Sequence, residues 1–161
     1  MKAPAIKRSH LAALALAILA SPAVQAADST TVTINATIVG VCKFFTTTPV
    51  MNINNTGTGS NIDPSLAGPA TGSALINYRC SSGTAPAFTV PATATVTCTT
   101  SATCGSATMT PTIASTGGGN GSGMGSGQNK TLTVTGSIAQ ASYENSPVGP
   151  YAGSMVVSIA P

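Results

Sequence analysis

Apolar and polar residues alternate with a period of two in several segments of the chain. The first lies near the N-terminus, where the apolar positions Val32, Ile34, Ala36 and Ile38 alternate with Thr31, Thr33, Asn35 and Thr37. Successive side chains of a β-strand point to opposite faces, so this pattern predicts a long strand over residues 27–41.

Two segments in the second half of the chain have the same alternation. Residues 131–139 place Leu132, Val134, Gly136 and Ile138 on one face and threonines on the other. Residues 152–159 form the last predicted strand, with Met155, Val157 and Ile159 on one side. Shorter strands are predicted over residues 50–53, 74–80, 87–90, 93–99 and 108–114.

Segments rich in Gly, Pro, Asn and Ser separate these strands, and no segment after residue 26 has a convincing helical period. Short strands at this spacing predict a single all-β sandwich domain. The longest glycine run, residues 117–127, is expected to be a flexible surface loop. Lys130 and Thr131 follow it, but Gln128 and Asn129 intervene, whereas a phosphate-binding loop has Gly directly before Lys.

The first 26 residues have the three parts of a secretory signal peptide. Lys2, Lys7 and Arg8 precede an apolar run over residues 11–20, and Val24 and Ala26 are small enough for the positions that a signal peptidase reads. The apolar run is too short to span a bilayer by itself, which disfavours a membrane anchor. We therefore expect residues 1–26 to be removed and the protein to be exported.

Removal of this segment changes the charge balance. Three of the six basic residues leave with it, so Lys43, Arg79 and Lys130 remain against Asp28, Asp63 and Glu144. The net charge of the remaining chain is zero, which gives no support for binding to nucleic acid. Since little charge repulsion keeps copies apart, such a chain associates readily.

All four cysteines, Cys42, Cys80, Cys98 and Cys104, lie after the signal segment. An even number in an exported chain predicts two disulfides, with three arrangements open. Cys98 and Cys104 enclose five residues, so a local pair is simplest, which leaves Cys42 to pair with Cys80.

The composition disfavours catalysis and metal binding. The only histidine, His10, lies in the signal segment, so the mature chain has no Ser-His-Asp or Cys-His pair and lacks the His ligands that zinc prefers. The three remaining carboxylates fall at the terminus or in loops, with nothing to bring two together. We expect no enzyme activity, no cofactor and no metal.

The N-terminal strand has two interpretations that its pattern alone does not separate. It is either the ordinary first strand of the sandwich, or its first half is an extension that completes the sheet of another copy. In the second case Val32, Ile34, Ala36 and Ile38 would fill pockets of that copy.

Three features in order along the chain resemble one family. They are the alternating segment that enters Cys42 (TVTINATIVGVC), the Tyr78, Cys80 and Gly83 group (YRCSSG), and the closing segment with Pro147, Gly149, Tyr151 and Val157 (PVGPYAGSMVVSI). With these features the mature chain resembles the spore coat protein U domain family, the archaic chaperone–usher pilus subunits of Gram-negative bacteria.

The resemblance implies an incomplete immunoglobulin-like β-sandwich that a donor strand from a partner completes. Residues 27–37 would be the donor-strand extension and residues 38–161 the pilin-like domain, whose last strand, with Met155, Val157 and Ile159, would border the acceptor groove. The partners would be a periplasmic chaperone, an outer-membrane usher, and neighbouring copies or related subunits. The subunit would pass through the periplasm to the cell surface or an extracellular fibre. The sequence as printed ends two residues after the last strand, so we expect no final strand from the chain itself.

The main alternative is a secreted monomeric β-sandwich that binds carbohydrate or a surface polymer. Sugar-binding surfaces usually expose Trp or Tyr, whereas this chain has no Trp. Tyr78 and Tyr151 lie in or directly beside predicted core strands, which leaves Tyr143 free. A two-domain tip adhesin is disfavoured because the mature chain is long enough for only one domain. An outer-membrane barrel is disfavoured because the predicted strands are few and form no aromatic girdles.

Overall fold

The computed structural model describes residues 28–161, and the predicted signal peptide lies outside them. The chain divides after Thr37 into two units. In the first unit, residues 28–37 are exposed and have no regular secondary structure. Within residues 28–161, no helix is long and apolar enough to cross a bilayer.

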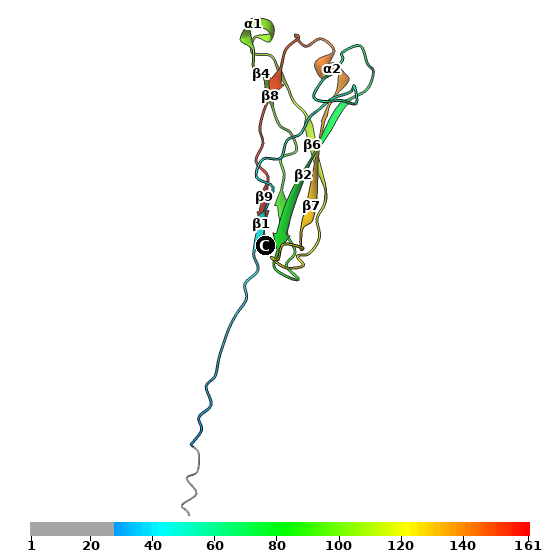
Figure 1. The fold of residues 1–161 in the computed structure, drawn as a ribbon. Helices are drawn as coiled ribbons and strands as arrows, with labels where there is room; N and C mark the ends of the chain where they lie inside the picture. The colour runs from blue at the N-terminus through cyan, green and yellow to red at the C-terminus, as the bar shows by residue number, and fades with distance from the viewer. Residues whose placement is uncertain (1–27) are drawn as a thin grey trace, which may run out of the picture. The chain divides into compact units, whose positions relative to one another are not determined.

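The regular secondary structure of the second unit, residues 38–161, consists of antiparallel β-strands and two short helices, which confirms the all-β class (Figure 1). Its strands are β1 (Cys42–Phe44), β2 (Ala70–Cys80), β3 (Ala87–Thr89), β4 (Val96–Cys98), β5 (Thr108–Met109), β6 (Thr112–Gly117), β7 (Lys130–Ile138), β8 (Tyr151–Ala152) and β9 (Ser158–Ala160). The two helices are single turns, α1 (Ser101–Cys104) and α2 (Gln140–Tyr143). Helices α1 and α2 lie at one end of this unit, and β1 and β9 at the other (Figure 1).

Antiparallel pairing joins the strands into three sheets. The largest has the order β1-β2-β7-β6, and the smaller ones are β5-β4-β8 and β3-β9. Strands β2 and β7 pair over nine residues, from Ala70 opposite Ile138 to Tyr78 opposite Lys130. Strand β7 follows its predicted alternation, because Leu132, Val134, Gly136 and Ile138 are buried while the intervening threonines are not.

The core lies on one face of this β2–β7 pair and has two parts. The first contains Ile76, Tyr78, Cys80, Leu132 and Val134. Phe88 of β3, Ile159 of β9 and Met155 of the segment between β8 and β9 pack against it. The second contains Ala70, Met109, Ile138 and Tyr143. Side chains from the smaller sheets therefore cover the inner face of the large sheet.

Several predicted strands are shorter in the structure or absent. The strand predicted over residues 27–41 does not form: regular pairing begins at Cys42, and residues 28–40 are exposed. A strand needs a neighbour for its backbone hydrogen bonds, and residues 28–37 have none within the described chain. The strand predicted over residues 108–114 divides at Pro111, which has no N–H to donate. The strand over residues 93–99 shrinks to β4.

Two further strand predictions are wrong along one side of the domain. Residues 50–53 form no strand, although the next residue, Asn54, makes an isolated bridge with Thr71. The last predicted strand is interrupted, because residues 153–157 separate β8 from β9. The alternation survives there, however, since Met155, Val157 and Ile159 are half-buried and the residues between them are exposed.

Both disulfides expected from the cysteine spacing are present, Cys42–Cys80 and Cys98–Cys104. Cys42 and Cys80 are direct cross-strand partners in the β1–β2 register, with Cα atoms 4.1 Å apart. This bond fixes β1 to the edge of the large sheet.

The glycine run at residues 117–127 makes several hydrogen bonds to the rest of the domain. The Tyr78 hydroxyl accepts a hydrogen bond from the Gly119 N–H (2.7 Å) and donates one to the Gly119 carbonyl (3.0 Å). Arg79 stacks over the Phe45 ring and donates to the Asn129 side chain and to the Met124 and Ser126 carbonyls. These contacts hold the loop against β2.

Candidate functional site

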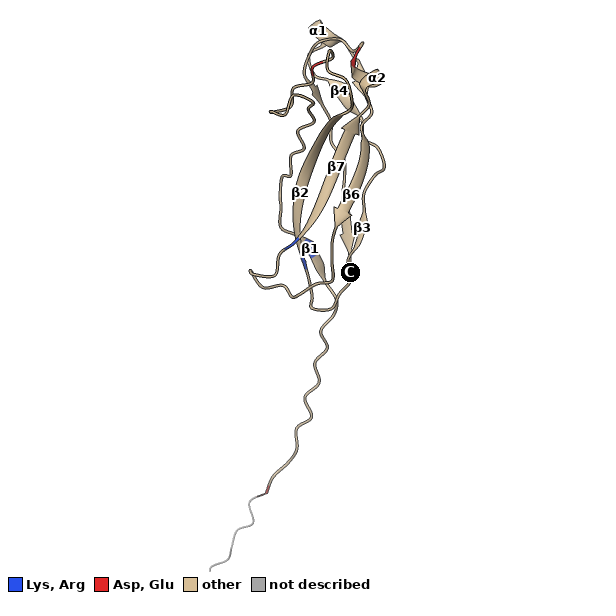
Figure 2. Ribbon diagram, turned by 90° about the vertical axis from the view of Figure 1, so that its right-hand side faces the viewer, with Lys and Arg blue, Asp and Glu red and all other residues tan. Residues whose placement is uncertain are grey.

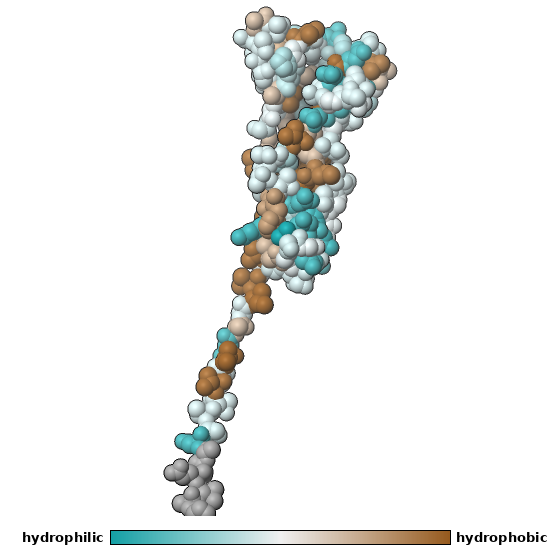
Figure 3. All heavy atoms as spheres, in the orientation of Figure 1, coloured by the Kyte–Doolittle hydropathy of each residue, from teal (hydrophilic) through white to brown (hydrophobic). Residues whose placement is uncertain are grey.

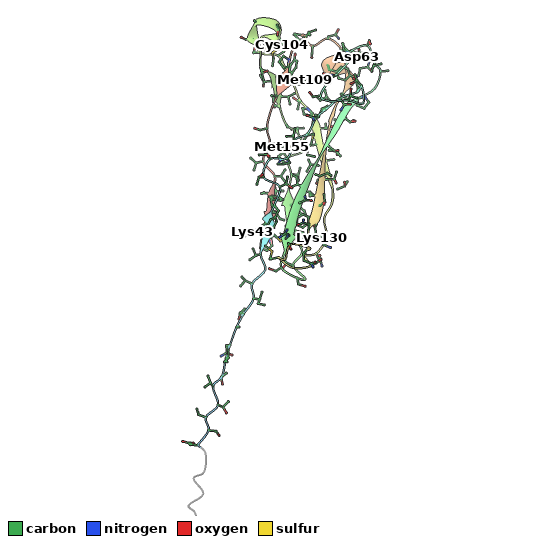
Figure 4. The ribbon with its side chains drawn as sticks, in the orientation of Figure 1. Lys43, Asp63, Cys104, Met109, Lys130 and Met155 are labelled. Carbon is green, nitrogen blue, oxygen red and sulfur yellow. A yellow bond between two sulfur atoms is a disulfide. The ribbon has the colours of Figure 1, made fainter. Side chains whose placement is uncertain are left out.

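An open apolar groove runs along the inner face of the large sheet. The part of the groove nearer β1, called its lower part, is a cavity of about 590 Å³. Its floor is the inner face of β2 and β7, with Ala74, Ile76 and Val134. Residues 49–51 and 53 form one wall, and residues 153–157 form the other. Met155 lies in the middle of the domain, between the end that carries β1 and the end that carries α1 (Figure 4).

The backbone of both walls lacks partners. Within residues 28–161, no backbone–backbone hydrogen bond is made by residues 47–53 or by residues 153–157. Each segment has regular pairing at its ends, at Phe45 and Asn54 on one side and at β8 and β9 on the other. Two segments with unpaired N–H and C=O groups therefore face each other across an apolar groove. Such groups are normally paired in proteins.

The groove continues towards α1 and α2 as a second cavity of about 900 Å³. The two cavities share Val50, Met51, Ile53, Val96 and Gly153 in their walls. The upper part is lined further by Ile62, Met109, Ile138, Tyr143 and Val148, so it too is mainly apolar.

A pair of glycines lets residues 51–53 lie close to the sheet between the two cavities. Gly72 and Gly136 are direct cross-strand partners in the middle of β2 and β7. A Cβ atom on Gly72 would lie 2.7 Å from the Asn52 carbonyl carbon, and one on Gly136 would lie 2.5 Å from the Met51 sulfur. Because these glycines have no side chains, residues 51–53 can occupy the space beside them. Met51 and Ile53 therefore lie in the wall where the two cavities meet.

Hydrogen bonds order the rim at the α2 end. Tyr143 is buried, and its hydroxyl donates to the Gly68 carbonyl and accepts from the Asn55 side-chain amide. Tyr143 is therefore not the free aromatic residue that a sugar-binding surface would require.

Asp63, near the same end, accepts hydrogen bonds from the Ser65 hydroxyl and from the Ser65 N–H. These bonds, chiefly the one from the hydroxyl, hold the pKa of the Asp63 carboxyl below its ordinary value of 3.8.

The structure places the residues predicted for the site in two settings. Val32, Ile34 and Ile38 of the predicted donor segment are 74%, 86% and 93% exposed, and Ala36 is exposed as well. Met155 and Val157 line the groove, whereas Ile159 packs in the core next to it. Figure 3 shows apolar side chains exposed along residues 28–37 and in patches on the domain.

Sequence reasoning missed the second wall and the glycine pair. Residues 50–53 carry apolar residues at Val50, Met51 and Ile53, which predicted a paired strand rather than an unpaired wall. The available signal was Gly136, a glycine at an apolar-face position of a long strand, which indicates the close approach of another segment.

Nothing in the described part of the chain adds a metal centre to the groove. Among residues 28–161, no group of three or more His, Cys, Asp and Glu side chains is arranged to hold a metal ion. Both disulfides lie outside the groove lining. The chemistry that this site offers is apolar contact and backbone hydrogen bonding.

Comparison with known proteins finds no match: no family model, no curated protein and no solved structure resembles the chain at a significant level.

Proposed function

We propose that the protein is a structural subunit that polymerises by strand donation between copies. The observation that carries the proposal is the groove with two unpaired backbone walls, in a chain that also has an exposed segment of alternating apolar residues. An inserted strand bonds to both walls through its backbone and places every second side chain in the groove.

The exposed N-terminal segment agrees in length with one wall of the groove, and its pattern suits the apolar floor. Residues 32–38 and residues 47–53 both span seven residues, which is about 23 Å of extended chain. The apolar side chains of residues 32–38 recur at every second position, as insertion over an apolar floor requires. Burial of a nearly fully exposed Val or Ile side chain contributes about 1.5–3 kcal/mol. The wall residues Met51 and Met155 would be covered at the same time.

The side chains of Val32 and Ile34 are largely exposed, so they offer apolar surface that donation to another copy would bury. An uncovered apolar groove with free backbone edges also promotes aggregation, so such a subunit needs a temporary cover during export. This need, together with the resemblance to spore coat protein U domain subunits, supports delivery by a periplasmic chaperone and an outer-membrane usher to a surface fibre or coat.

A deletion and a matched pair of substitutions test the proposal. The chain without residues 28–37, the variant Ile34→Asp and the variant Thr33→Asp are each co-expressed with a candidate chaperone and usher. The variants Ile34→Asp and Thr33→Asp add the same charge to opposite faces of the segment. We expect heat-resistant oligomers from the wild type and from Thr33→Asp, and few or none from Ile34→Asp and the deletion. Undiminished oligomers from the deletion would contradict strand donation.

A further inference from the structure

The charged side chains of the unit formed by residues 38–161 are separated between its two ends. Lys43 lies opposite Arg79 in the β1–β2 register, and Lys130 lies opposite Tyr78 in the β2–β7 register. All three cations therefore gather at the β1 end (Figures 2 and 4). Asp63 lies at the end that carries α1 and α2 (Figure 4), and Glu144 directly follows α2 at the same end.

No other Lys, Arg, Asp or Glu occurs in this unit, so every such side chain follows this separation. Pro161 lies at the β1 end too (Figure 1), and a free carboxylate on it would offset one of the three positive charges. The β1 end is called the cationic end below, and the end with Asp63 and Glu144 is called the carboxylate end.

Each of the two carboxylates is next in sequence to residues that line the upper cavity. Asp63 stands between Ile62 and Pro64, which both line the upper cavity. Glu144 directly follows Tyr143, which lines the same cavity. The cations instead lie where the donor segment joins the domain, because residues 38–41 lead from that segment directly into β1, which contains Lys43.

We propose that the cationic end of one copy docks on the carboxylate end of the next, so that charge orients the copies head to tail. The inference rests on the proposed strand donation, because a donor segment that enters the groove at the carboxylate end brings Lys43 of its own copy to Asp63 and Glu144 of the acceptor. The opposite arrangement places like charges together. Exposed ion pairs add little affinity, so the contact selects orientation and accelerates association.

Charge reversal at one residue of each end tests the docking in the full mature chain. Lys43 and Glu144 are exposed, and neither side chain makes a hydrogen bond within residues 28–161. Lys43→Glu lowers the side-chain charge of the cationic end from +3 to +1, and Glu144→Lys changes that of the carboxylate end from −2 to 0. The double variant carries +1 and 0 at its two ends, so it retains the least attraction between them.

The measurement is the rate of association by light scattering at about 10 mM and about 1 M salt, since the screening length falls from roughly 30 Å to 3 Å over this range. We expect each single variant to associate about 3–10-fold more slowly than the wild type at low salt. The double variant associates more slowly still, and the differences disappear at high salt. Equal rates for all variants at low salt, or a double variant as fast as the wild type, would overturn the inference.

The same samples separate this inference from strand donation. If the deletion of residues 28–37 abolishes polymers while charge reversal changes nothing, strand donation holds and the end-to-end docking is wrong. If the chain forms no polymers at all, strand donation fails, and the second virial coefficient at low salt then decides the docking. Attraction that weakens in both single variants and weakens most in the double variant supports docking, and unchanged coefficients overturn it.

Discussion

Replacement of Gly72 by alanine tests the close approach of residues 51–53 to the sheet, on which the shape of the groove depends. The new Cβ would lie 2.7 Å from the Asn52 carbonyl carbon and 3.0 Å from the Ile53 Cα, both backbone atoms. Ordinary carbon–carbon contacts are about 3.5–4.0 Å, so residues 52–53 must move by about 1 Å. Forced overpacking of this kind costs about 1–3 kcal/mol.

Alanine also restricts the unfolded chain, which offsets about 0.4–1 kcal/mol of that cost. We therefore expect the free energy of unfolding of Gly72→Ala to fall by about 1–2 kcal/mol relative to the wild type. Gly136→Ala should cost less, because the nearest atom to its Cβ is the sulfur of the flexible Met51 side chain. Gly127→Ala is the matched control, since a Cβ there meets no atom within 4 Å.

Urea denaturation of the monomeric chain without residues 28–37, followed by circular dichroism, measures these differences. An unfolding slope of about 1–3 kcal/mol/M converts the expected loss for Gly72→Ala into a midpoint shift of order 1 M. If Gly72→Ala is as stable as Gly127→Ala, then residues 51–53 do not lie against the glycine pair and the groove as described is wrong.

Three further predictions concern the scaffold around the groove. Tyr78→Phe should lower the free energy of unfolding by about 1–3 kcal/mol, measured by urea denaturation. The substitution removes the hydroxyl that bonds to both the N–H and the C=O of Gly119. A loss below about 0.5 kcal/mol would contradict this role. Removal of the Cys42–Cys80 disulfide by paired alanine substitution should cost about 4 kcal/mol, against about 2 kcal/mol for Cys98–Cys104, because the sequence separations are 38 and 6 residues; equal losses would show that loop closure does not set the difference. The lowered pKa of Asp63 should stabilise the fold above pH 3.8 and lose this effect as the pH falls through the folded pKa; Ser65→Ala should move that pKa back towards 3.8 in a carbon NMR titration, and an unmoved titration would exclude the Ser65 bonds as its cause.

The long strands are predictable from the sequence because one of their faces is buried against the core. Strand β7 has the predicted bounds to within one residue, since four apolar positions at period two leave one register open. The two disulfides follow from the cysteine spacing for a similar reason, because short and long separations leave one simple arrangement.

The two walls of the groove are not predictable in the same way. Residues 50–53 and 152–159 have the composition and pattern of strands, yet residues 50–53 and 153–157 have no backbone partner within the described chain. The alternation of apolar and polar residues predicts which side chains face the core. Backbone pairing depends instead on whether a neighbouring strand is present. The sequence thus predicts strands at both places, and their unpaired state is what the proposed donor strand would satisfy.

The central claim is that residues 32–38 of one copy enter the groove of another. A photo-crosslinking residue at position 34, in a mixture of isotopically labelled and unlabelled chains, measures this directly by mass spectrometry. We predict crosslinks between chains from position 34 to the groove residues Met51, Met155 or Val157. Crosslinks confined to a single chain, or directed to the exposed Leu75 on the other face of β2, would contradict strand donation.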